Sequence, residues 1–177
     1  MNQMLSDLKV IDLTHFIAGP LCTKLMAGFG AQVIKIEKPR QGDGSRAMGP
    51  FPQNKPHLEN SGLFLYLNTG KKSITLNLRS ELGALIFKKL IKDADLVVEN
   101  FEPQVLPSLG LSYETIKEIN PQLIMTSISN FGQESAYRDY KTTNLTALAW
   151  GGALFLEGNT EQPVKMGGSR AEEMSGL

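Results

Sequence analysis

Two short stretches hold residue types and spacings suited to chemistry. His15 to Pro20 (HFIAGP) joins a β-like run to a helix-like segment. Free N–H groups and the helix dipole at such a junction favour an anion or a polar ligand group. Glu172 and Glu173 pair two carboxylates after a Gly-Gly turn. Each stretch also has a structural interpretation: a tight strand-to-helix turn for the first, and an acid-rich first helical turn for the second.

Two groups of basic residues surround the second and third expected strands. The first group comprises Lys35, Lys38, Arg40 and Arg46, and the second comprises Lys71, Lys72 and Arg79. Together they suit a multiply charged anion, and solvated surface charge is the alternative interpretation. Glu37 directly precedes Lys38, so a ribose hydroxyl and a phosphate both remain open as ligands at the end of the second strand.

The known short motifs for catalysis and phosphate binding are absent. The chain has no GxGxxG fingerprint, no phosphate loop and no GxSxG elbow. The two histidines, His15 and His57, do not complete a persuasive Ser-His-Asp order. The residues by themselves therefore indicate an α/β protein that binds a nucleotide-like ligand.

Composition narrows the class of protein. With 177 residues, 18 basic and 18 acidic, the chain is expected to form one domain or at most two, and its zero net charge gives no case for nucleic acid or a membrane surface. The single cysteine, Cys22, excludes an internal disulfide and a zinc site, and we expect it to be a small buried hydrophobe. No transmembrane run or signal peptide is recognisable, so a cytoplasmic protein is expected.

Apolar runs alternate with helical patterns along the chain. Strands are expected at residues 8–13, 31–37, 73–78, 95–99 and 123–128. Helices are expected over 18–29, from an N-cap at Ser80, and over 111–119 with Ser112 as a possible cap. Continuously apolar strands that alternate with helices predict a mostly parallel sheet with helices on both faces.

The loops after these strands are where such folds bind ligands. They are residues 14–20, 37–46, 99–103 and 129–133. Residues 38–60 form one long segment with four prolines and three glycines, and no periodic pattern. Loops of this length inside a domain are usually functional or mobile.

The order of several motifs closely resembles the family III CoA-transferases, the CaiB/BaiF family. The matching stretches are HFIAGPLCTKLMAGFGAQVIKIEKP (15–39), DLVVENF (95–101), LGLSYETIKEINPQLI (109–124) and SISNFGQ (127–133). The resemblance covers essentially the whole chain. It implies a Rossmann-like large domain, of which residues 1–177 resemble only the N-terminal, CoA-binding segment. The rest of the large domain and a small domain would then be absent, as in a fragment or a truncated gene product.

The resemblance also implies a reaction. Members of the family attack an acyl-CoA thioester with an Asp carboxylate and pass through an acyl anhydride and an enzyme–CoA thioester. The family Asp lies in an A-D-x-x-S/T-G pattern, and AEEMSG (171–176) places Glu172 there. Glu keeps the carboxylate nucleophile but adds one methylene, which displaces the reactive oxygens by roughly 1.5 Å. No metal and no permanently bound cofactor are implied, because coenzyme A is a substrate.

Further residues are implied to bind coenzyme A. They are His15, Phe16, Ile17, Ala18, Lys38, Leu76, Arg79, Asn100, Phe101 and Asn144. Ile17 replaces a Gln of the formyl-CoA branch, Ser108 replaces an Arg of some members, and Asn144 resembles the carnitine-type branch. Racemases of the family carry a His near the position of Thr143, and this chain has none there. A racemase is therefore a weaker hypothesis than a transferase.

Two hypotheses follow from the resemblance. In the first, the chain is a CoA-transferase acting on an acyl-CoA and a carboxylic acid. In the second, it is a non-catalytic CoA-binding relative or a partner subunit. The family's interlocked dimers imply a homodimer or a complementing C-terminal chain, and poor solubility of the segment alone. A nicotinamide oxidoreductase is disfavoured because GxGxxG is absent.

Overall fold

The centre of the fold is a five-stranded, all-parallel sheet. The computed structural model describes residues 3–157, 161–162, 164 and 167–177. The strand order is β3-β2-β1-β4-β5, and Ile11 of β1 pairs with Ile34 of β2 and Val97 of β4. The strands are β1 (Lys9–Asp12), β2 (Gln32–Glu37), β3 (Lys72–Thr75), β4 (Leu96–Glu99) and β5 (Ile124–Ser127). All five strands predicted from the sequence are confirmed.

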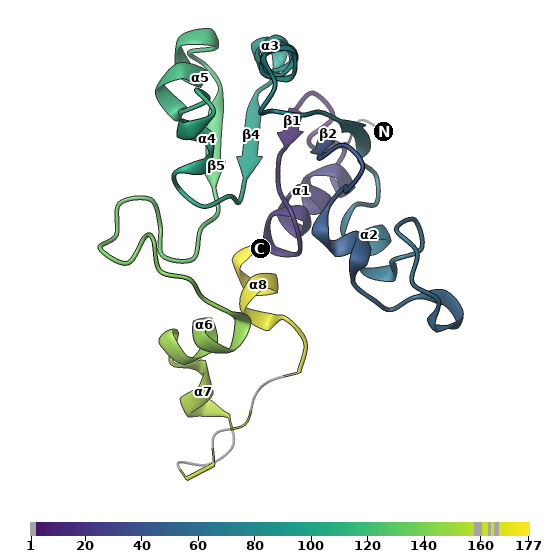
Figure 1. Ribbon diagram of the computed structural model, residues 1–177, viewed down its shortest axis with the longest axis vertical. Coiled ribbons are helices and arrows are strands. Elements are labelled where there is room, and N and C mark those ends of the chain that lie inside the picture. The colour runs from purple at the N-terminus through teal and green to yellow at the C-terminus, as the bar shows by residue number, and fades with distance from the viewer. Residues whose placement is uncertain (1–2, 158–160, 163, 165–166) are drawn as a thin grey trace.

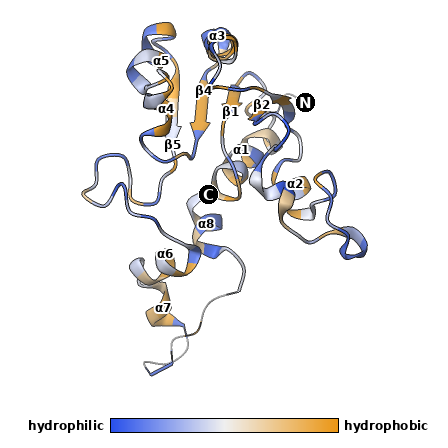
Figure 2. Cartoon of the chain, in the orientation of Figure 1, coloured by the Kyte–Doolittle hydropathy of each residue, from blue (hydrophilic) through white to orange (hydrophobic). Residues whose placement is uncertain are grey.

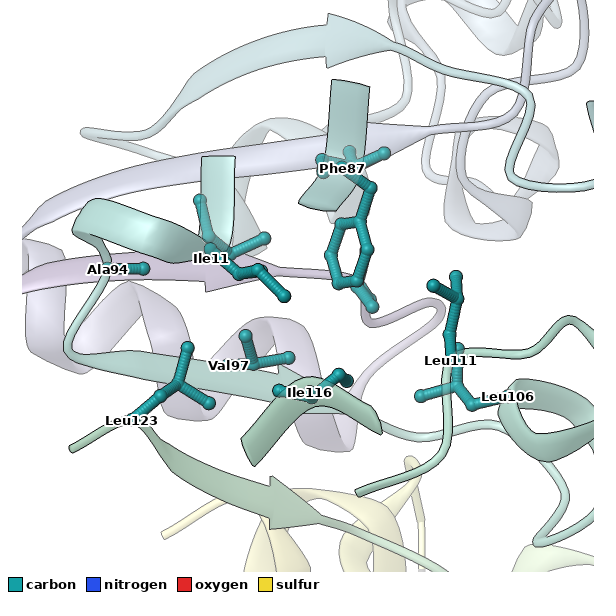
Figure 3. Packing of buried hydrophobic residues seen from close by; sticks show 11 residues of the cluster. Ile11, Phe87, Ala94, Val97, Leu106, Leu111, Ile116 and Leu123 are labelled. Carbon is teal, nitrogen blue, oxygen red and sulfur yellow. The ribbon is translucent and has the colours of Figure 1, made fainter. Parts of the chain in front are cut away.

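The larger core lies on one face of this sheet. The helical elements on this side are α3 (Glu81–Leu90), η3 (Ile91–Asp93), α4 (Val105–Ser108) and α5 (Tyr113–Ile119). Phe87 of α3, Leu106 of α4 and Ile116 of α5 pack with Ile11 and Val97 from the central strands (Figure 3). Side chains alternate between the two faces of a strand, so the neighbours of these strand residues point the other way.

The second face is covered by α1 (Ala18–Gly28). Val10, Val33 and Val98 form a smaller core there, against Met26 and Ala27 of α1. The parallel sheet with helices on both faces is therefore confirmed (Figure 1). Figure 2 shows the matching hydropathy, with the central strands strongly apolar.

Serine caps set the starts of three helices. Ser80 accepts a hydrogen bond from the Gly83 N–H and Ser112 accepts one from the Thr115 N–H, so both expected caps are confirmed. Ser61 caps α2 (Gly62–Leu67) in the same way, and the sequence analysis did not anticipate this helix. Among the described helices, none is long and apolar enough to cross a membrane.

The edge strands differ from the continuously apolar pattern that was expected. All four residues of β3 are exposed, and Ile124 of β5 is 65% exposed. The third strand also begins at Lys72 and ends at Thr75, earlier than the expected residues 73–78. Cys22 is half-buried rather than fully buried, and burial raises the pKa of its thiol.

The long segment after β2 is anchored to the sheet. It forms the 3₁₀ turns η1 (Gly44–Ala47) and η2 (Pro52–Asn54), and Asp43 and Ser45 are buried. The Ser61 hydroxyl donates hydrogen bonds to the carbonyls of Ser45 and Met48, which closes the loop on α2. Burial of Asp43 and Ser45 and these bonds fix both ends of the segment to the fold.

The chain beyond β5 extends past the carboxyl edge of the sheet and returns to α1. It forms α6 (Asn144–Trp150), α7 (Ala153–Leu156) and α8 (Arg170–Ser175). Figure 1 shows α6 and α7 below the sheet, with α8 directly beneath the start of α1. Neither α6 nor α7 was predicted from the sequence, and of α8 only the acid-rich first turn was predicted.

Candidate active site

A cavity of about 590 Å³ lies beyond the carboxyl ends of β1, β4 and β5. Its walls come from segments distant in the sequence: the loop after β1, the loops after β4 and β5, the start of α6, and α8. Six predicted site residues line it, namely Phe16, Ala18, Asn100, Phe101, Asn144 and Glu172. The fold thus brings the first and last candidate motifs of the sequence into one cavity.

Three side chains hold the loop that follows β1. The Asn100 amide exchanges two hydrogen bonds of 2.8 Å with the N–H and carbonyl of His15. Asp43 Oδ1 accepts from the Phe16 N–H at 3.0 Å, and the Lys35 ammonium donates to the Thr14 carbonyl at 2.8 Å. These bonds keep Phe16 at φ 65°, a left-handed conformation that is costly for a residue with a side chain.

The same loop leads into the N-terminus of α1. Ile17 is the N-cap, and no side chain caps the helix. Ala18, the first helical residue, lines the cavity, so this end of the helix faces the space in which a ligand would lie. Ile17 is only 4% exposed and does not line the cavity. His15 lies beside it, with its ring centroid 5.6 Å from that of Phe101.

Beneath this loop lies a buried network of charged groups. Asp12 accepts from the Lys71 ammonium at 2.9 Å and from the Thr23 hydroxyl at 2.7 Å. The Lys35 ammonium lies 2.8 Å from Asp43 Oδ2 and 3.9 Å from Asp12 Oδ2. Burial tends to raise the pKa of Asp12, but the two lysines and the hydroxyl donors outweigh it and lower that pKa. Burial lowers the pKa of Lys71 to about 8.

This network changes the interpretation of the basic groups. Lys35 and Lys71 are neutralised inside the fold. Arg46 binds both carboxylate oxygens of Glu37, at 2.7 and 2.9 Å. Glu37 also accepts from the Asp43 N–H and the Ser73 hydroxyl, so its oxygens are committed to holding the loop and not to a ribose. Three of the seven basic residues are therefore structural, which overturns a cradle built from both complete groups.

Three predicted ligand residues lie away from the cavity. Lys38 and Arg79 are exposed, just after β2 and a few residues after β3 respectively. Leu76 is partly buried against the larger core. None of the three is among the residues that line the cavity around Glu172. The structure thus places six of the predicted site residues around the cavity and leaves Lys38, Leu76 and Arg79 outside its lining.

Glu172 reaches the cavity from α8. It is half-buried, and burial, with a smaller contribution from Glu173, raises the pKa of its carboxyl. At the far end of this helix, Gly176 lies so close to α1 that a Cβ atom there would be 2.3 Å from the Ala18 carbonyl oxygen. The Ala171 N–H donates to Asn144 Oδ1 at 2.9 Å. These contacts place Glu172 over the start of α1.

Sequence reasoning missed several residues of the cavity wall. They come from the segment between β5 and α6, and include Arg138, Tyr140, Lys141 and Thr142. The available signal was their place in the loop that follows a parallel strand, of which only residues 129–133 were predicted to face a ligand. Tyr140 also belongs to an aromatic cluster with Phe131, Tyr137 and Trp150.

An open parallel sheet defines a Rossmann-like α/β protein, and proteins of this class bind ligands beyond the carboxyl ends of the strands, where this cavity lies. Comparison with known proteins is more specific. The model of CoA-transferase family III matches residues 5–177, and the chain belongs to this family. Acetyl-CoA:oxalate CoA-transferase of Acetobacter aceti is 38% identical over 170 residues. Succinate–glutarate CoA-transferase of Agrobacterium fabrum is 36% identical over 176 residues.

A solved structure supports the same assignment. The crystal structure of a CaiB/BaiF family protein from Brucella suis matches with a TM-score of 0.90 and 36% identity, over 99% of this chain and 47% of that one. The Acetobacter protein is matched over 96% of this chain and 42% of its own length, and the Agrobacterium protein over 98% and 44%. The chain therefore spans less than half the length of these relatives.

Proposed function

We propose that the chain is the CoA-binding, nucleophile-bearing part of an enzyme that moves coenzyme A between an acyl-CoA and a carboxylic acid. The observation that carries this proposal is the meeting of Glu172 with the loop after β1 in one cavity. Residues 1–177 would then be the N-terminal segment of the large domain, acting as a homodimer or together with a complementing C-terminal chain. Its substrates would be an acyl-CoA and a carboxylate.

The proposed reaction starts at the Glu172 carboxylate. One of its oxygens attacks the thioester carbonyl carbon and the C–S bond breaks. The CoA thiolate departs, and a mixed anhydride between the acyl group and Glu172 remains. The thiolate then attacks the Glu172 carbonyl carbon, which releases the acyl group as a carboxylate and leaves a glutamyl–CoA thioester. The acceptor carboxylate attacks this thioester carbon, the C–S bond breaks, and a second mixed anhydride forms between the acceptor and Glu172. The released thiolate attacks the acceptor's carbonyl carbon of this anhydride, which gives the new acyl-CoA and frees the Glu172 carboxylate. No oxidant or reductant is required.

The site offers suitable electrostatics for these steps. The uncapped N-terminus of α1 favours the negative charge that develops on the thioester carbonyl oxygen. Burial lowers the pKa of His15, which favours the neutral form of its ring beside this loop. The raised pKa of Glu172 makes its carboxylate a stronger nucleophile once ionised.

A non-catalytic CoA-binding role is the second candidate. It is favoured by the extra methylene of Glu172 relative to the family Asp, because a displacement of about 1 Å costs roughly 100-fold in rate if nothing compensates. Its second support is that the chain spans less than half the length of its relatives.

Trapping of the acyl-enzyme separates the two candidates. The chain is incubated with an acyl-CoA and hydroxylamine, and mass spectrometry locates any hydroxamate. A transferase gives a hydroxamate at Glu172 that is absent from Glu172→Gln and retained in Glu173→Gln, the matched control. Binding of coenzyme A without a hydroxamate refutes the catalytic proposal and supports the second candidate. Absence of CoA binding, measured by calorimetry, refutes both for this chain.

A further inference from the structure

The amide of Asn144 is directed at the start of α8. Ser169 is the N-cap of α8, and its side chain makes no capping hydrogen bond. The Ala171 N–H, in the first turn, donates instead to Asn144 Oδ1 at 2.9 Å. The Asn144 amide nitrogen lies 3.4 Å from the Gly168 carbonyl oxygen, a long hydrogen bond. Both polar ends of Asn144 therefore face the backbone that leads into the helix carrying Glu172.

We propose that Asn144 is a positioning residue that caps α8 from the neighbouring helix and thereby sets the place of the Glu172 carboxylate. The effect of Asn144 on the reaction at Glu172 rests on the proposed function. It replaces the expectation that Asn144 is a ligand of coenzyme A, because its amide is already bound to protein backbone. Its contact with α8, however, stands on geometry alone.

The start of α6 is itself fixed, so Asn144 offers a firm support. Thr143 and Thr146 form a reciprocal capping box in which each side chain binds the other residue's backbone N–H. Asn144 is the first residue of α6, inside this box. The acceptor at Asn144 Oδ1 is therefore held by local bonds that do not depend on a ligand.

The helix needs such support because it is short. α8 has six residues, and a helix of this length is not stable by itself. Asn144 holds its first turn, and the contact of Gly176 with Ala18 holds its end. Glu172 lies between the two, so loss of either contact releases the carboxylate from its position.

The test compares Asn144→Ala with Asn144→Asp, which keeps an oxygen acceptor. In Asn144→Ala we expect faster hydrogen exchange at the Ala171 amide, measured by NMR, and hydroxamate formation at Glu172 slowed about fivefold, the size of a lost helix cap. Affinity for coenzyme A should stay within about twofold of the parent value, because the Asn144 side chain binds the protein backbone and not the ligand. Asn60→Ala is the matched control, since Asn60 is exposed and outside the cavity.

Asn144→Asp provides a readout that a purely structural role would not move. It should restore protection of the Ala171 amide. Its added negative charge in the same cavity should move the pH profile of Glu172 labelling upward, because a neighbouring carboxylate disfavours ionisation.

Three outcomes overturn the inference. The first is unchanged Ala171 exchange in Asn144→Ala. The second is a loss of CoA affinity equal to the loss in labelling, which would make Asn144 a ligand. The third is Asn144→Asp behaving like Asn144→Ala. Absence of labelling in the unsubstituted chain refutes the proposed function, and with it the catalytic role of Asn144. The exchange measurement then still decides whether Asn144 caps α8.

Discussion

Replacement of Gly176 by alanine tests whether the close contact of α8 with α1 sets the position of the Glu172 carboxylate. An added Cβ would lie 2.3 Å from the Ala18 carbonyl oxygen and 3.1 Å from Leu21 Cβ. Contacts shorter than about 3 Å are not tolerated, so the end of α8 must retreat by roughly 0.7 Å or more. The backbone of Gly176 has an ordinary negative φ of −91°, so the effect comes from this contact and not from backbone strain.

The expected consequence is loss of chemistry with little loss of ligand binding. A displacement of about 1 Å at a reacting group costs on the order of 100-fold in rate. Overpacking at the same time lowers the free energy of unfolding by about 1–3 kcal/mol. Hydroxamate formation at Glu172 should therefore slow between about 10- and 100-fold, because neighbouring residues absorb part of the shift. Affinity for coenzyme A should change less than about threefold, since the loop after β1 is held elsewhere.

Gly28→Ala is the matched control, because a Cβ at Gly28 of α1 meets nothing within 4 Å. It should label at the rate of the parent chain. If Gly176→Ala also labels at the parent rate while remaining folded, the close approach of α8 to α1 does not position Glu172, and the reasoning fails.

Three further predictions concern charge. Lys71→Met should lower the free energy of unfolding by about 3–5 kcal/mol in denaturant titrations, because Asp12 loses its closest cation, whereas exposed Lys72→Met should change it by under about 0.5 kcal/mol. Arg46 and its neighbours lower the pKa of Glu37 to about 2 from 4.5, so they stabilise the fold above pH 4.5 by about 3 kcal/mol. That stability should vanish as pH falls through about 2, and Glu37→Gln should remove this pH dependence. Labelling of Glu172 should fall as pH drops through its raised pKa, and Glu173→Gln should shift the midpoint downward; an unchanged midpoint contradicts this.

The sheet could be predicted from sequence because its signals are local. Short runs rich in Val and Ile, such as residues 95–99, have few other stable conformations once helices flank them. Ser80 and Ser112 mark helix starts through bonds within four residues. Several short helices were missed, namely the four-residue α4 and α7 and the capped α2 and α6. Helices this short depend on tertiary contacts rather than on propensity.

The charge network could not be predicted, because it depends on which residues meet in space. Lys35 and Lys71 are 36 positions apart and looked like free surface cations. The pairing of Asp12 with Lys35 across β1 and β2, and the bond from Lys35 to the Thr14 carbonyl, place the first cation beneath the loop. The meeting of Glu172 with Asn100 in one cavity is equally non-local. Resemblance to a family supplied both residues without showing how each is held.

The two halves of the candidate site are anchored in different ways. Thr14, His15 and Phe16 each have a backbone group bound by a buried or half-buried side chain, from Lys35, Asn100 and Asp43 respectively. These side chains belong to the charge network or follow β4, so substituting them should lower the stability of the sheet itself. In contrast, α8 rests on the Asn144 bond and the Gly176 contact, outside the sheet. Substitutions at Asn144 or Gly176 should lower the rate of hydroxamate formation at Glu172 more than the free energy of unfolding. The ratio of these two effects therefore distinguishes residues that hold the loop after β1 from residues that position Glu172.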